Sequence, residues 1–154
     1  MPHIHSLIDF AVEVFIVHED KVLLRRHDKY KIWLSVGGHI ELNEDPNQAA
    51  LREVKEEVGL DIKLDESLKP TYQKGDTLEL IPPYFLNRHR IEPNHEHVVL
   101  VYFATSSTDK ILQPTKGEQS EECRWFSKKE IEQSEDIIPN VKFYAIKALE
   151  KLAN

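Results

Sequence analysis

The segment from Asp45 to Leu60 carries the signals for both ends of a helix, and this limits the fold more than any other feature. Asp45 can cap the helix, Pro46 suits its first position because no N–H is needed there, and Gln48 can complete a capping box. Gly59 can adopt the left-handed conformation that ends a helix, with Leu60 as the apolar contact. The sequence therefore predicts a helix that begins near Pro46 and stops at Gly59.

Apolar runs on both sides of this helix predict a sheet. Residues 10–17 read FAVEVFIV and residues 98–105 read VVLVYFAT, which is typical of buried strands. Glu19-Asp20 offers a turn into a second strand at residues 21–26, so a hairpin is expected. The other predicted elements are strands at 61–64, 71–74 and 122–126, a proline-containing loop at 81–97, and helices at 128–133 and 141–152, the last with Phe143, Ile146, Leu149 and Leu152 on its apolar face. The fold class predicted is α/β, a mixed sheet with helices on both faces.

Composition limits the class of protein. A length of 154 residues with 40% hydrophobic residues fits one domain, taken as residues 1–154. The formal net charge of −7 argues against a nucleic-acid partner, since that binding needs clustered lysine and arginine. A single cysteine, Cys123, gives no disulfide, and neither a signal peptide nor a run long enough to span a membrane is seen. A cytoplasmic protein with no membrane partner is expected.

The predicted helix carries a cluster of carboxylates. At 100° per residue, one arc should pack on the sheet, formed by Ala50, Leu51, Val54 and Val58. Glu53, Glu56 and Glu57 form a ridge at the edge of this arc, and like charges at such spacing repel by a few tenths of a kcal/mol per pair. Arg52 can pair with Glu56 but cannot neutralise three carboxylates. A hard divalent cation could, with Mg²⁺ the first candidate and Mn²⁺ the second.

The alternative is that this acidic run is only a solvated helix face, which is the usual case for such runs. The preceding loop favours a site instead. Gly37 and Gly38 lack Cβ atoms and allow backbone to approach a ligand closely, and Glu41 and Glu44 add two more carboxylates. Together with the capped helix, these residues predict a metal-binding site.

At this point the sequence resembles the Nudix hydrolases, whose defining box is G-x5-E-x7-R-E-U-x-E-E-x-G-U, where U is aliphatic. All nine fixed positions are present within 23 residues: Gly38, Glu44, Arg52, Glu53, Val54, Glu56, Glu57, Gly59 and Leu60. Such a match is far more specific than a lone glycine motif. The order of a hairpin before the box, and of strands and a terminal helix after it, is also similar to the family.

The resemblance implies an α/β/α sandwich that hydrolyses nucleoside diphosphates linked to a further group, with Mg²⁺ or Mn²⁺ as cofactor. It implies that Glu53, Glu56 and Glu57 are metal ligands, that one of them is also the base for the attacking water, and that Gly37 offers its backbone carbonyl to the metal. Arg52 would orient a box glutamate and Glu44 would position Arg52 or the loop. A homodimer is compatible with the resemblance.

This chemistry suits the residues, because a diphosphate is anionic and a metal must neutralise its oxygens before water can attack. Two alternatives remain open: a binding module of the same fold that senses a nucleotide without cleaving it, and an acidic helix with no site. The substrate is a small nucleotide-like molecule whose identity stays open between nucleoside triphosphates, including oxidised ones, and nucleotide sugars, since loops outside the box select it. The number of metal ions also stays open.

Candidates outside the box are weaker. Glu118, Glu121 and Glu122 precede the last predicted strand, and any of them could add a metal ligand or base. The run His95-Glu96-His97 suggests a zinc site, but no cysteine or further histidine stands at a recognised spacing. His3 and His5 are still weaker candidates for zinc ligands. Four residues could stack on or clamp a base or phosphate, although core or loop anchoring is the commoner role for aromatic residues: Trp33, Tyr84, Phe85 and Arg88.

Overall fold

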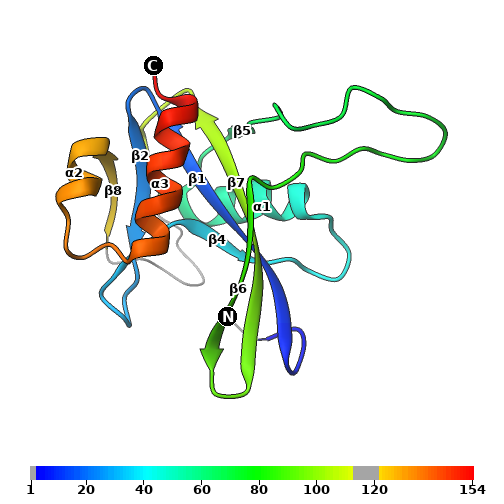
Figure 1. The fold of residues 1–154 in the computed structure, drawn as a ribbon, viewed down its shortest axis with the longest axis horizontal. Helices are drawn as coiled ribbons and strands as arrows, with labels where there is room; N and C mark the ends of the chain where they lie inside the picture. The colour runs from blue at the N-terminus through cyan, green and yellow to red at the C-terminus, as the bar shows by residue number, and fades with distance from the viewer. Residues whose placement is uncertain (1–2, 113–121) are drawn as a thin grey trace.

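The computed structural model describes residues 3–112 and 122–154, and these residues form one mixed sheet with helices on both faces (Figure 1). Eight strands belong to the sheet: β1 (Ile8–His18), β2 (Lys21–Arg26), β3 (Trp33–Leu34), β4 (Val36–His39), β5 (Ile62–Leu64), β6 (Phe85–Glu92), β7 (His95–Ser106) and β8 (Glu122–Ser127). The helices are α1 (Pro46–Val58), α2 (Lys128–Gln133) and α3 (Pro139–Leu152). The predicted fold class is confirmed.

Strand β1 lies at the centre of the sheet. It pairs antiparallel with β2 and β4 and parallel with β7. In this register Asp9 lies beside His97, and Ala11 lies opposite His39. Residues from three distant parts of the sequence therefore meet on one face at one end of the sheet.

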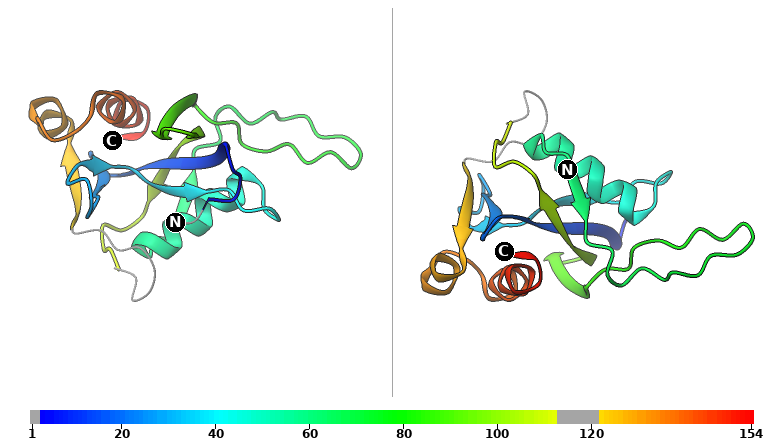
Figure 2. Two further views of the ribbon diagram at one scale, coloured as in Figure 1. Left: turned by 90° about the horizontal axis from the view of Figure 1, so that it is seen from below. Right: turned by 90° about the horizontal axis from the view of Figure 1, so that it is seen from above.

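The two faces of the sheet have separate cores because side chains alternate along each strand. Val12, Val14 and Ile16 of β1 pack with the buried side of α1. Phe15 and Val17 point the other way and pack with α3 and Ile131 of α2. Figure 2 shows α1 on one side of the sheet and α2 with α3 on the other. The box helix and the C-terminal helix are thus separated by the sheet.

Both ends of α1 are as predicted. The Asp45 side chain accepts a hydrogen bond from the Gln48 amide, the Gln48 side chain accepts one from the Asp45 amide, and Gly59 ends the helix with φ of 70°. The predicted inward arc needs a correction, because Leu51 is 44% exposed while Ala49 is buried. The arc is rotated toward Glu53 and Glu57, so these two carboxylates lie within the packed side of the helix and not at its edge.

Several other predictions can now be compared with the structure. The strands at 61–64 and 122–126 and the helices at 128–133 and 141–152 are confirmed. The strand at 71–74 is wrong, since that segment has no strand, and Phe143 is half exposed while Tyr144 packs in the core. No helix among the described residues combines the length and apolar character needed to cross a membrane.

The predicted loop at 81–97 is also wrong, because most of it forms the hairpin of β6 and β7. The side chains of β6 are largely exposed on both faces, so its sequence lacks the apolar alternation that marks a half-buried strand. Backbone hydrogen bonds to β7 form this strand. The parallel pairing of β7 with β1 places His97 beside Asp9, and His95 lies close to both.

Candidate active site

Arg52 connects carboxylates of α1 with a carboxylate of the loop before it. Its Nη2 and Nε atoms donate to the two oxygens of Glu44 at 2.6 and 3.0 Å, which is the bidentate geometry that makes such pairs strong. Its Nη1 atom donates to Glu53 at 3.0 Å and to Glu56 at 3.1 Å. These hydrogen bonds raise the pKa of Arg52, and the bond from Arg52 lowers the pKa of Glu44. Arg52 therefore holds three carboxylates in fixed positions.

Glu53 is the most deeply placed of the box glutamates, with 4% of its surface exposed. Its carboxyl group lies against Gly38, where an added Cβ would be 2.4 Å from the nearest carboxyl atoms. Only glycine leaves room for the carboxylate there. Burial raises the pKa of Glu53, while the charge and hydrogen bond of Arg52 oppose that rise. The glycine thus has a packing role as well as a place in the motif.

Glu57 contacts Gly37 of β4, which stands just before the box, and Arg25 of β2, which lies outside it. Its Oε2 atom accepts a hydrogen bond from the Gly37 amide at 3.3 Å and lies 3.2 Å from Nε of Arg25 on β2. Both side chains are about nine-tenths buried. Arg25 was missed by the sequence reasoning, although an arginine that follows the apolar run of β2 was a signal that could have found it.

Glu56 differs from the other two, because its side chain is 61% exposed. The three ligand candidates therefore run from buried Glu53 through Glu57 to exposed Glu56, all on one side of α1. The donor set fits a hard divalent cation: the candidate ligands are carboxylate oxygens, and the backbone of Gly37 and Gly38 lies directly against two of them. Glu41 is more distant, with its carboxylate 3.8 Å from Nη1 of Arg52.

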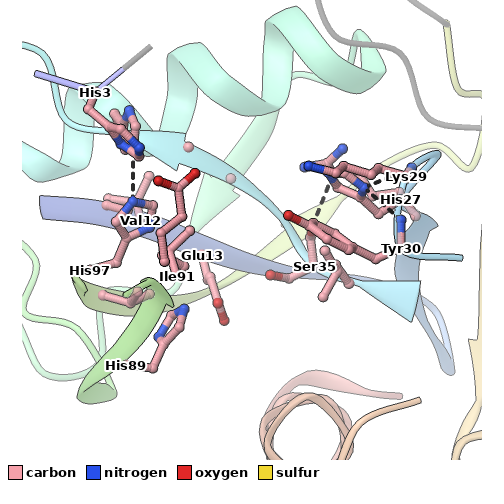
Figure 3. Close-up of a pocket in the computed structure, with 18 residues that line it drawn as sticks. His3, Val12, Glu13, His27, Lys29, Tyr30, Ser35, His89, Ile91 and His97 are labelled. Carbon is pink, nitrogen blue, oxygen red and sulfur yellow. Dashed lines mark hydrogen bonds between the residues drawn. The ribbon is translucent and has the colours of Figure 1, made fainter. Parts of the chain in front are cut away.

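A cavity of about 460 Å³ opens beside β4, on the side of the sheet away from α1 (Figure 3). This volume is in the range of small-molecule sites. Arg25, Gly37 and Gly38 line it where it approaches the carboxylates, and Lys29 and Tyr30 form one end. Arg25 and the two glycines are thus shared between the cavity and the carboxylate cluster.

Glu13 lines the same cavity from β1. Burial raises the pKa of Glu13 to about 7, and a hydrogen bond from Ser35 opposes that rise. Its Oε2 atom is buried and accepts no hydrogen bond from the described residues. A buried acceptor without a donor is costly, which makes Glu13 a candidate to receive a hydrogen bond from a ligand. The sequence showed Glu13 only as an interruption of an apolar strand.

Of the candidates outside the box, His3 and His97 line the cavity. Glu122 is exposed at the start of β8, and Glu118 and Glu121 lie outside the described residues. The four residues considered as base or phosphate contacts are not among the described residues that line the cavity. They make other contacts: Trp33 with Phe126, Tyr84 with Phe103, Phe85 with Tyr144, and Arg88 with Glu96.

Comparison with known proteins decides the family. A sequence model of the NUDIX domain matches residues 8–146. The chain belongs to the Nudix family. A solved Nudix-family hydrolase from Clostridium perfringens shares 35% identity with it at a TM-score of 0.79, covering 93% of this chain and 97% of the other. The family prediction made from the box is confirmed.

Curated relatives of this Nudix chain are similar over its larger part. Dihydroneopterin triphosphate diphosphatase of Haemophilus influenzae is 33% identical over 112 residues, which cover 72% of this chain and 68% of the relative. The protein of that name from Escherichia coli K12 is 36% identical over 87 residues, 56% of each chain. The prediction of a hydrolase of diphosphate linkages is confirmed, and as a Nudix hydrolase the chain uses a divalent cation and acts on a small nucleotide-like molecule.

Proposed function

We propose that this Nudix hydrolase cleaves its diphosphate linkage with Mg²⁺, or alternatively Mn²⁺, bound by Glu53, Glu56, Glu57 and the backbone carbonyl of Gly37. The observation that carries the proposal is the packing of two helix carboxylates against the backbone of two consecutive glycines. Repulsion among these carboxylates is only partly offset by arginine, so a bound cation would stabilise the cluster.

The contacts support different roles for the metal ligands, the base and the positioning residues. Mg²⁺ bound there would neutralise the diphosphate oxygens and lower the pKa of the attacking water. One of the three glutamates would accept the proton of that water as its oxygen bonds to phosphorus and the bond to the bridging oxygen breaks. Arg52 and Glu44 are positioning residues, since Arg52 fixes two of the ligands and Glu44 fixes Arg52.

We further propose a triphosphate with a bicyclic base of the pterin or guanine type as the substrate class. The names of two similar relatives point to a pterin triphosphate. Such bases present adjacent N–H donors on one edge, and the buried oxygen of Glu13 supplies an acceptor inside the cavity. Arg25 and Lys29 line the same cavity and supply positive charge for an anionic ligand.

The experiment is a substrate panel with Mg²⁺, comparing dihydroneopterin triphosphate, GTP, ATP, UTP and a nucleotide sugar. We expect the pterin and guanine triphosphates to have the highest kcat/KM. Glu57→Gln should abolish most of the activity, while Glu132→Gln, an exposed glutamate on α2, should retain it. Full activity in Glu57→Gln would show that the proposed ligand set is wrong.

The role of Glu13 is tested separately from that of the metal ligands. Glu13→Gln should lower kcat/KM for the pterin and guanine triphosphates more than for UTP, whose base has a different donor pattern. Equal losses on all substrates would contradict the assignment of Glu13 to base recognition. Binding of the triphosphates without release of any phosphate product would favour the alternative of a sensing module.

A further inference from the structure

A second cluster of metal-binding side chains lies on the opposite face of the sheet from the box glutamates. His3, Asp9, His95 and His97 each offer one ligand atom, and these four atoms lie within 4.8 Å of one another. His3 precedes β1, Asp9 lies on β1, and the two other histidines lie on β7. Since Asp9 pairs with His97 in the parallel ladder, and His95 is two residues away, their side chains share one face.

The interatomic distances suit a small tetrahedral ion. Oδ2 of Asp9 lies 3.1 Å from Nε2 of His95 and 3.3 Å from Nδ1 of His3. Ligands held 2.0–2.1 Å from zinc at tetrahedral angles are about 3.4 Å apart, so these separations need little adjustment. His39 borders the cluster, with Nε2 3.1 Å from Nε2 of His97 and 3.7 Å from Asp9.

His95 gives an independent sign that this arrangement suits a bound cation. Its side chain is buried, with 4% of the residue exposed, and its Nδ1 atom lies 3.3 Å from the carbonyl oxygen of Ser6. When Nδ1 donates to that carbonyl, the neutral ring directs a lone pair at Nε2 toward the carboxylate of Asp9. Nε2 makes no hydrogen bond with any described residue despite the short distance. In that tautomer two acceptors face each other in a buried place, and a cation bound between them would remove their repulsion.

The other groups are already oriented as metal ligands usually are. The backbone amide of His5 donates to Oδ1 of Asp9 at 2.8 Å, and that of Ile4 donates to both oxygens of Asp9 at 3.2 Å. These bonds hold the carboxylate with Oδ2 facing the imidazoles. A histidine ligand commonly donates its second nitrogen to a carbonyl, as His95 is placed to do with Ser6, which fixes the ring and its tautomer.

We propose that His3, Asp9, His95 and His97 form a zinc site separate from the Mg²⁺ site of the catalytic reaction. Three imidazole nitrogens and one carboxylate favour zinc over magnesium, which prefers an all-oxygen set. The ion would fasten the segment before β1 to β7. His3 and His97 both line the cavity, so this ion also fixes part of the cavity wall (Figure 3).

The test is a zinc titration of the full chain, prepared without a histidine tag and freed of metal by a chelator. Calorimetry in excess Mg²⁺ should give one equivalent of tightly bound Zn²⁺, and Co²⁺ should give the visible absorption of a tetrahedral nitrogen and oxygen site. Zinc should also raise the melting temperature. Absence of zinc binding, or octahedral cobalt spectra, would overturn the proposal.

A matched pair of substitutions locates the ion. His3→Ala changes an exposed residue outside the sheet and should weaken zinc binding at least about tenfold, whereas His5→Ala, two residues away on the same segment, should not. His97→Ala should repeat the loss, with circular dichroism to confirm that the fold is retained. Equal zinc affinity in His3→Ala and His5→Ala would refute the assignment.

A third variant separates this proposal from the proposed function. Glu57→Gln should keep the full zinc affinity although it loses hydrolysis. If zinc binding fell in Glu57→Gln and stayed unchanged in His3→Ala, the ion would belong to the carboxylate cluster, and the histidine site would be disproved without any consequence for the hydrolase assignment.

Discussion

The carboxylate cluster and the histidine cluster lie on opposite faces of the sheet and meet at β4. Gly38 leaves space toward Glu53 on the side of α1, and the next residue, His39, contacts His97 on the other side. The carboxylates come from little more than one turn of one helix, whereas the proposed zinc ligands come from three segments of the chain. A cluster from one helix can therefore be predicted from the spacing of its residues, whereas a cluster from three distant segments cannot.

The two clusters also differ in the cation that they suit. Carboxylate oxygens suit Mg²⁺, and imidazole nitrogens suit zinc. The expectation is that changes to the box glutamates should alter hydrolysis without altering zinc binding, and that changes to the histidine cluster should alter zinc binding.

The largest effect is expected for Glu53→Gln. If Glu53 holds the metal as proposed, its loss removes several kcal/mol of transition-state stabilisation, so kcat/KM should fall by about 100-fold or more. Zinc affinity of the histidine cluster should not change. Steady-state kinetics and calorimetry on the same preparation measure both quantities. A twofold loss, or a parallel loss of zinc binding, would break the separation.

Arg52→Lys should have the next largest effect. Lysine keeps the charge but cannot hold Glu44 bidentately while also bonding to Glu53 and Glu56, so kcat/KM should fall about 10–100-fold. Because Nη2 of Arg52 also donates to the carbonyl of His39, this variant is the most sensitive test of communication between the clusters. Kinetics in a series of Mg²⁺ concentrations should show weaker metal binding. Unchanged metal dependence would rule out the positioning role.

Gly38→Ala should lower activity by about tenfold, because its Cβ would displace the carboxylate of Glu53. The comparison variant is Gly75→Ala. Gly75 has φ of 68° and nothing within 4 Å of an added Cβ, so that change should cost about 1–2 kcal/mol of stability and leave kcat/KM unchanged. Kinetics and thermal melts distinguish the two. Equal kinetic effects would mean that contact with Glu53 is unimportant.

The smallest effect concerns pH and Glu13. Its pKa is about 7 in the folded protein, raised by burial from an ordinary value of 4.5, so the folded state holds this proton more tightly than the unfolded state. The contribution of Glu13 to the free energy of unfolding is therefore fully present below pH 4.5 and is lost as the pH rises through 7. Between pH 5 and 8, the melting temperature of the native chain should therefore fall relative to that of Glu13→Gln. Parallel curves would contradict the raised pKa.

Much of the fold followed from local sequence signals. The caps of α1, the hairpin of β1 and β2, and the buried run of β7 all have short-range signatures, and each was predicted with nearly its observed bounds. Strand β6 was missed because its exposed side chains carry no periodic pattern. Leu51 was assigned to the core because a helical wheel gives the shape of an apolar arc but not its rotation against the sheet.

The sequence by itself determined the helix, its capping residues and the spacing of its glutamates, because contacts at three and four residues are fixed by helix geometry. Only the tertiary structure placed Arg25 beside Glu57, Glu13 in the cavity and His3 beside Asp9. These pairings depend on strand order and register, which bring together residues that are distant in the chain. Short-range periodicity carries no information about such contacts, because backbone pairing across the whole sheet sets them.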